Sequence, residues 1–165
     1  MKQRLIPAVL AAGLFATVGP TAAVNAAPPT DAGDSDTIAG VCSFLEPVEY
    51  TLTGKTKTIT RPDGQRIITS PGQRITLTAN RKTVTYVITG TRFERDVVVD
   101  GQQITEIRVE GRNLLVNGPG AERRGIFLVV GNFNYALDAN FNEVKGRGFN
   151  VNGPGQVTDV CAALT

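Results

Sequence analysis

The sequence predicts an all-β fold, an antiparallel β-barrel or β-sandwich of roughly nine or ten short strands followed by a short C-terminal helical turn. Threonine and valine are frequent, and no segment sustains the apolar period of about 3.6 residues that a helix needs. Glycine and proline separate the apolar runs at intervals of about eight to twelve residues. The only two cysteines, Cys42 and Cys161, lie near the two ends of the segment expected to fold.

The first 26 or so residues have the three-part pattern of a secretory signal. Lys2 and Arg4 give a positive start, residues 5–18 are apolar, and small residues follow up to a cleavage site after Ala26. A membrane anchor is disfavoured because the apolar run is shorter than the roughly 20 residues that a spanning helix needs. We therefore expect residues 1–26 to be a signal peptide for Sec-type export, and the protein to be secreted into the medium or the cell wall.

Net charge argues against a nucleic-acid partner. The chain has 17 basic and 15 acidic residues, and removal of Lys2 and Arg4 with the signal leaves 15 of each. A near-neutral protein lacks the basic excess that drives binding to nucleic acid or to an anionic membrane. Residues 27–40 are predicted to be a disordered acidic leader, because they combine few apolar side chains with three aspartates, Asp31, Asp34 and Asp36.

Residues 41–165 are predicted to form a single disulfide-closed β domain, a size typical of one domain. The bridge is expected because an exported protein with an even number of cysteines usually oxidises them. Alternating apolar and polar residues predict strands with one buried face around Val48, Tyr50 and Leu52, Ile75 and Leu77, Val84, Tyr86 and Ile88, and Phe133, Tyr135 and Leu137. The segment 126–130 is apolar throughout, so we expect a central strand there.

Turn residues divide these strands. The pairs Asp63-Gly64 and Asp100-Gly101 suit hairpin loops whose central residues both have positive φ. Pro-Gly pairs at 71–72, 119–120 and 154–155 fit the central positions of type II turns. At the C-terminus, Thr158 or Asp159 is expected to cap a helical turn that runs through Ala163.

Three segments resemble a family of small exported proteins of actinobacteria: Gly111-Arg112-Asn113-Leu114-Leu115, the run from Gly125 to Phe133, and the closing run from Val157 to Leu164. The resemblance covers most of the expected mature chain and includes both cysteines. It implies export, a disulfide and a bacterial source. It implies no activity and no site residues.

The residue types exclude several kinds of catalytic site. The chain has no histidine, which rules out Ser-His-Asp and Cys-His catalysis and histidine zinc sites. Two oxidised cysteines would supply neither a thiol nucleophile nor a thiolate ligand. A calcium-loop pattern opens at Asp138 but fails, because Glu143 stands where glycine is needed and Phe149 where a bidentate glutamate is needed. We expect no metal and no cofactor.

Carboxylates are the remaining candidates for catalysis. A cofactor-free β-barrel enzyme, an isomerase, a cyclase or a glycosidase, could use acidic residues on two adjacent strands: Glu94, Asp96, Glu106 and Glu110. Arginines interleaved with them favour cross-strand ion pairs on a solvated sheet instead: Arg92, Arg95 and Arg108.

The leading hypothesis is a secreted, non-enzymatic binding protein for a small molecule, an extracellular protein or a cell-envelope polymer, acting as a monomer or small homo-oligomer. Contacts are expected from polar side chains that gather at turns, namely Asn113, Asn117, Arg123, Arg124, Asn132 and Asn134. The carboxylate enzyme is the first alternative. A structural protein of the envelope is the second.

Overall fold

A computed structural model of the chain describes residues 27–144, 146–147, 150–151 and 155–165. The predicted signal peptide and most of the predicted turn at 153–155 lie outside these residues. The described part contains twelve strands and one helical turn, α1 (Val160–Ala163), and every strand pairing in it is antiparallel. The predicted all-β antiparallel fold is confirmed.

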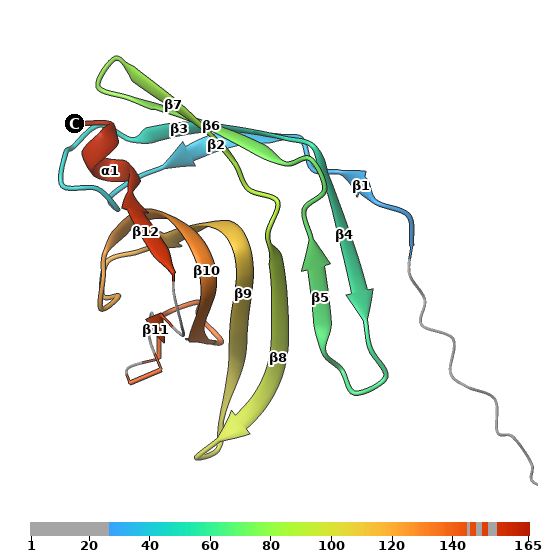
Figure 1. Cartoon of the computed structure of the whole chain (residues 1–165). Helices are drawn as coiled ribbons and strands as arrows, with labels where there is room; N and C mark the ends of the chain where they lie inside the picture. Colours follow the sequence, from blue (N-terminus) through green and yellow to red (C-terminus); the bar gives the residue numbers. More distant parts are fainter. Residues whose placement is uncertain (1–26, 145, 148–149, 152–154) are drawn as a thin grey trace, which may run out of the picture.

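The strands form two sheets, which Figure 1 shows one above the other. The larger sheet has the order β1-β4-β5-β8-β9-β10-β11, with β12 also paired to β10. Its strands are β1 (Thr30–Asp31), β4 (Lys55–Thr60), β5 (Arg66–Thr69), β8 (Thr91–Val99), β9 (Gln102–Asn117), β10 (Gly125–Asp138), β11 (Asn150–Val151) and β12 (Gln156–Asp159). The smaller sheet has the order β2-β3-β6-β7, formed by β2 (Asp34–Ile38), β3 (Val48–Thr53), β6 (Arg74–Ala79) and β7 (Lys82–Val87).

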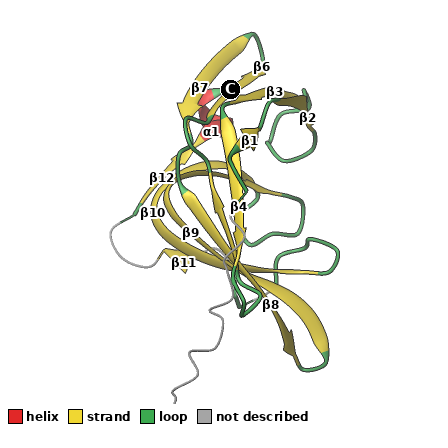
Figure 2. Ribbon diagram, turned by 90° about the vertical axis from the view of Figure 1, so that its right-hand side faces the viewer, coloured by secondary structure: helices red, strands yellow, loops and turns green. Residues whose placement is uncertain are grey.

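The larger sheet is curled, as the turned view in Figure 2 shows, but it does not close. Among the described strands, β1 pairs only with β4, and β11 and β12 pair only with β10. A closed barrel would need a ladder between the two outer edges. The expectation of a barrel is therefore corrected to two separate open sheets.

The first core joins the two sheets. Alternate residues of the smaller sheet face inward, among them Val48 and Leu77, and pack with Ile126 and Leu128 of β10 and with Leu164 after α1. Leu77, Ile126 and Leu164 are fully buried. In β3, β6 and β7, the apolar residues of the predicted alternating pattern are thus the ones that face β10.

The second core lies on the other face of β9 and β10. It contains Ile107, Val109 and Leu115 from β9 with Phe127, Val129 and Phe133 from β10. Because β10 carries a core on each of its faces, its segment 126–129 is apolar throughout and buried. This confirms the predicted central strand, which β9 flanks on one edge and β12 on the other.

Residues 27–40 differ from the disordered leader that the sequence predicted. They supply β1 and β2, and β2 pairs along its whole length with β3. The Tyr50 hydroxyl donates to Asp34 Oδ2 at 2.8 Å, and this bond is the largest cause of the raised pKa of Tyr50. Backbone pairing with β3 therefore orders a segment whose side chains remain mostly exposed.

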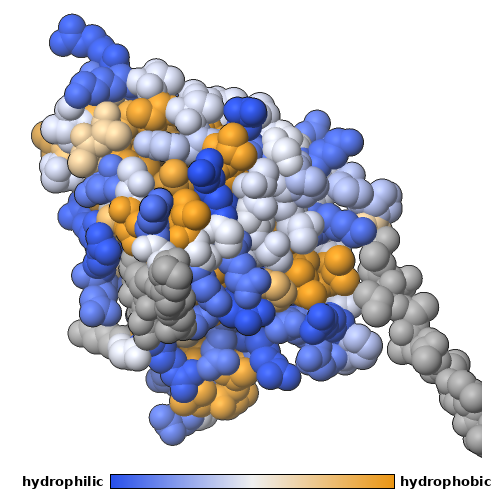
Figure 3. Space-filling model, in the orientation of Figure 1, coloured by the Kyte–Doolittle hydropathy of each residue, from blue (hydrophilic) through white to orange (hydrophobic). Residues whose placement is uncertain are grey.

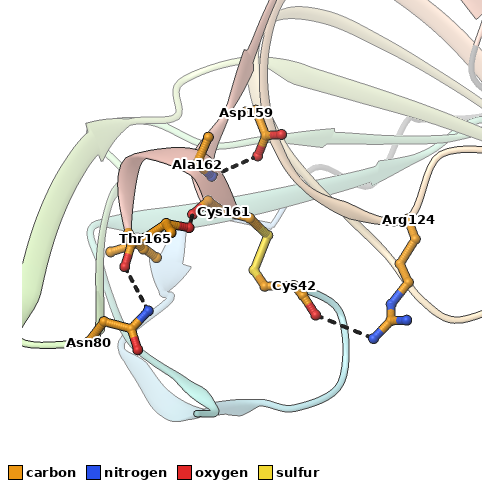
Figure 4. Close-up of a disulfide and its surroundings, with 8 residues drawn as sticks. Cys42, Asn80, Arg124, Asp159, Cys161, Ala162 and Thr165 are labelled. Atoms are coloured by element: carbon orange, nitrogen blue, oxygen red, sulfur yellow. Dashed lines mark hydrogen bonds between the residues drawn. A yellow bond between two sulfur atoms is a disulfide. The ribbon is translucent and has the colours of Figure 1, made fainter. Parts of the chain in front are cut away.

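The disulfide between Cys42 and Cys161 is confirmed, and it spans 119 positions of sequence. Cys161 lies in α1, whose N-cap residue Asp159 accepts a hydrogen bond from Ala162 N at 3.0 Å. Asn80 in the β6–β7 turn donates to Leu164 O at 2.9 Å (Figure 4). The bridge and this bond together fasten the C-terminal turn to the smaller sheet.

Two glycine-containing positions shape the long strands. Asp100 and Gly101 both have positive φ, as the predicted β8–β9 hairpin requires. In the middle of β9 and β10, Gly111 lies opposite Gly131, and both have positive φ. Such residues let a strand bend sharply. No helix among the described residues has the length and apolar character needed to cross a membrane.

Candidate functional site

The strand register separates the four candidate carboxylates onto two faces of the larger sheet. Glu94 lies opposite Ile107, which in turn lies opposite Tyr135, so Glu94 shares the face of the second core. Two residues further along β8, Asp96 lies on the same face. Glu106 lies opposite Arg95 and therefore points, with Glu110, to the other face. The strand register therefore does not place the two pairs on one face.

On the face of the second core, Glu94 and Asp96 form a charge cluster with Arg66 and Arg92. Arg66 places Nε 2.8 Å from Glu94 Oε2 and Nη1 2.9 Å from Asp96 Oδ2. Arg92 Nε lies 2.6 Å from Glu94 Oε1, and Thr105 donates to Asp96 Oδ1 at 2.7 Å. Hydrogen bonding by Arg66 lowers the pKa of Asp96, and Thr105 adds to this effect. The Asp96 carboxylate is thus held as an anion, and Glu94 lies between two guanidinium groups.

On the opposite face, the carboxylates are also paired. Glu106 accepts from Arg147, and Glu110 lies 3.4 Å from Arg108. The Arg108 guanidinium stacks 4.4 Å from the centre of the Phe93 ring. Glu106, Arg108 and Arg147 border a hollow of about 480 Å³, which Glu94 also borders but Glu110 does not. Glu110 pairs within β9 and Glu106 pairs with Arg147 outside the strands, so the predicted ion pairs form on this face but do not join two strands. The arrangement does not favour acid-base catalysis.

The six polar residues predicted to contact a ligand do not form one site. Three of them hold backbone in place: Asn113 donates to Glu110 O, Asn117 to Arg123 O and Arg124 to Cys42 O. The others are dispersed, with Arg123 4.7 Å from the centre of the Phe127 ring, Asn132 half-buried on β10 and Asn134 beside the hollow on the opposite face. Of the six, Asn117 alone lines the groove described next.

A groove of about 560 Å³ lies between the β9–β10 turn and the loop that follows β10. Leu115, Tyr135 and Leu137 line it and also pack with the second core, so its floor continues that core. Arg92 of the charge cluster reaches the same groove. Polar side chains also line it, among them Arg92, Asn142 and Glu143, and a volume of this size with an apolar floor is typical of sites for small molecules.

Two exposed apolar side chains border the groove. Phe141 is 84% exposed and Val116 is 46% exposed, and both line it. The described surface has only two other large apolar residues that are similarly exposed, Leu45 and Val98, and neither borders the groove. Figure 3 shows apolar side chains at several separate places on one face of the molecule, without a single large patch. The groove is thus a place where exposed apolar side chains and a cavity coincide.

The loop after β10 holds Phe141 in an unfavourable backbone conformation. Phe141 has a φ of 62°, which a bulky L-residue rarely adopts. The Asp138 carboxylate fixes the loop, because its Oδ1 accepts from Asn140 N at 2.8 Å and from Asn142 N at 2.9 Å. Hydrogen bonding by the Asn142 backbone is the main cause of the lowered pKa of Asp138. Strain of this kind persists where the surrounding structure enforces it and is concentrated at functional sites.

The same bonds disfavour a cation at this loop. Asn140 and Asn142 direct N–H groups at the Asp138 carboxylate, and the Asn142 side chain adds a further donor. A calcium ion would need those oxygens to face it instead. No group of three or more acidic residues or cysteines suited to a metal ion occurs in the part of the chain that the structure describes.

Sequence reasoning missed residues of both the charge cluster and the groove. Arg66 lies in β5, far in sequence from the carboxylates it pairs, so only the fold reveals it. Tyr135 and Leu137 were identified as one strand face, but not as the floor of a site. Phe141 carried a usable signal, an aromatic residue in a loop rich in aspartate and asparagine.

Burial gives Tyr135 its character within the groove. Loss of solvent around the phenol is the largest cause of its raised pKa, so this side chain is uncharged at neutral pH.

Comparisons with protein-family models, curated proteins and solved structures find no match to this chain, so the resemblance to exported actinobacterial proteins stays a prediction.

Proposed function

We propose that the protein is a secreted, non-enzymatic binding protein that takes a small ligand in the groove. The observation that carries the proposal is the strained, exposed Phe141 at the border of a 560 Å³ groove whose floor is apolar. An exposed aromatic ring held at a backbone cost is difficult to explain by stability alone, whereas a ligand that stacks on it would explain both the exposure and the strain.

The compartment is part of the proposal. The N-terminal pattern supports Sec-type export. The disulfide between Cys42 and Cys161 is compatible with an oxidising location outside the cytoplasm. Within the fold, we describe the region where both sheets pack on the first core as sandwich-like, because inward-facing residues of the two sheets meet there.

The arrangement of acidic residues gives the enzyme alternative little support. Each of the four candidate carboxylates lies beside an arginine. A general acid would need a carboxyl whose pKa is raised, whereas the pKa of Asp96 is lowered by Arg66. No observation specifically favours a structural role in the envelope.

Native mass spectrometry of the full chain, purified from the medium of an expressing bacterium, tests the proposal. We expect an added mass that denaturation releases, and we expect Phe141→Ala to lose it. Leu45→Ala is the matched control, because Leu45 is equally apolar and fully exposed but lies away from the groove. An added mass retained by Phe141→Ala would refute the groove as the site. Protein that carries no ligand and binds no member of a small-molecule library would refute the function.

A further inference from the structure

Among the described residues, the groove is lined by an arginine, Arg92, whose terminal nitrogens donate no hydrogen bond to protein. The Arg92 contact with Glu94 is made by Nε, and in the described part of the chain neither of its two Nη atoms donates a hydrogen bond to protein. The Arg92 side chain is 41% exposed, and Nε itself is buried without a well-directed hydrogen bond. A guanidinium in this setting can donate to a ligand oxygen.

The charges around Arg92 sum to zero. Arg66 and Arg92 contribute two positive charges, and Glu94 and Asp96 contribute two negative charges within the same cluster. A ligand carboxylate would therefore place a third anion beside two existing ones. A ligand amine would meet Arg92, and Glu143, which also lines the groove, already accepts a hydrogen bond from Glu122 N. A carboxylate or an amine would lose hydration in the groove without gaining an ion-pair partner of its own. An uncharged oxygen acceptor can accept a hydrogen bond from Arg92 without that loss.

The walls define the rest of the ligand. Leu115 and Leu137 form apolar floor, and Phe141 offers a ring at the border. A flat apolar body can bury surface against the leucines and stack on that ring. Tyr135 adds an uncharged phenol that can donate or accept one hydrogen bond.

We propose that the groove selects uncharged amphipathic molecules, with a flat apolar body and a carbonyl or hydroxyl oxygen that accepts a hydrogen bond from Arg92. This inference rests on the proposed function, because it specifies the ligand of the same groove. It predicts discrimination by head group when the apolar body is kept constant.

Three naphthalene derivatives test this selection on the unmodified protein: acetylnaphthalene, naphthoate and naphthylmethylammonium. Isothermal titration calorimetry at pH 7 and low salt measures their affinities. We expect the ketone to bind at least about tenfold more tightly than either charged probe, since one net hydrogen bond to a charged donor and one avoided charge burial are each worth this much. Equal affinities, or tighter binding of naphthoate, would overturn the inference.

Two variants connect the preference to the side chains. Arg92→Met should weaken ketone binding about tenfold, and Phe141→Ala should weaken all three probes, whereas Leu45→Ala should change none. Circular dichroism verifies that each variant is folded; if Arg92→Met is not, the probe series on the unmodified protein still decides. Naphthoate binding that is as tight as ketone binding and depends on Phe141 would leave the groove as a site and refute only its selectivity. Binding of no probe, together with no co-purifying ligand, would refute the proposed function itself.

Discussion

Removing the disulfide should destabilise the fold substantially, and the size of the effect can be calculated from the chain. Cys42 and Cys161 enclose a loop with a sequence separation of 119. In the chain-entropy description, loss of a cross-link that closes such a loop raises the entropy of the unfolded state and costs about 5 kcal/mol at 25 °C. Measured values for single disulfides are usually about 2–4 kcal/mol. We expect the double variant Cys42→Ala, Cys161→Ala to lose about 3–5 kcal/mol.

Equilibrium unfolding in urea, followed by far-ultraviolet circular dichroism, measures this loss. Both cysteines are buried in the first core, so truncation to alanine adds a packing term on the order of 1 kcal/mol. Wild-type protein kept reduced by a thiol separates the two terms, because it lacks the cross-link but retains both sulfur atoms. The reduced protein should therefore unfold at a slightly higher urea concentration than the double variant, and at a much lower urea concentration than the oxidised protein.

A loss under about 1 kcal/mol on reduction would refute this reasoning. It would mean that residual contacts between α1 and the smaller sheet keep the two cysteines close in the unfolded chain. The alternative meaning is that closing the loop does little to reduce the conformational entropy of the unfolded state. Native stabilities of single domains are about 5–15 kcal/mol, so the expected loss is a large part of the total.

Three further variants test the core, a turn and the charge cluster. Leu77→Ala removes a side chain with 0% exposure from the first core and should cost about 2–5 kcal/mol in urea unfolding; a loss below about 1 kcal/mol would contradict the packing described. Gly54→Ala should cost about 1–3 kcal/mol, because Gly54 has a φ of 105° and a new Cβ would lie 2.6 Å from Gln73 Cα; an unchanged urea midpoint would contradict this close approach. Asp96→Asn should lower stability at neutral pH and make little difference in acid, since Arg66 lowers the pKa of Asp96 below its ordinary 3.8 in the folded state. The stabilisation is therefore present above about pH 4 and is lost as the pH falls through the folded pKa, so urea midpoints that stay equally separated down to about pH 2 would count against it.

The strands that the sequence predicted well are those whose pattern is local. Alternation around Tyr50 and Leu77, and the uninterrupted apolar segment 126–130, report burial directly, because a strand with one buried face alternates and a strand with two does not. The C-terminal turn was equally accessible, since Asp159 caps it through a bond three residues away. Each of these features depends on residues that are close together in the chain.

The features that escaped prediction depend on distant partners. The acidic segment 34–38 has few apolar side chains to bury, and backbone hydrogen bonds to β3 order it. Its own side chains do not indicate this pairing. Barrel closure failed for a related reason, because no pattern in the sequence states which edge strands meet. The asparagines expected at a binding surface instead satisfy backbone carbonyls nearby, as Asn113 and Asn117 do. Polar residues at turns have structural uses that compete with ligand binding.

The position of α1 has a consequence for the order in which the protein can be completed. Leu164 is fully buried in the first core, Lys82 contacts Thr165 O, and Cys161 is the second half of the cross-link. These residues follow all the described strands in sequence, so they are synthesised after those strands. Until they are in place, the inner face of the smaller sheet lacks part of its cover and Cys42 has no partner. Formation of the disulfide by an external oxidant therefore reports that α1 has reached its native position against the smaller sheet.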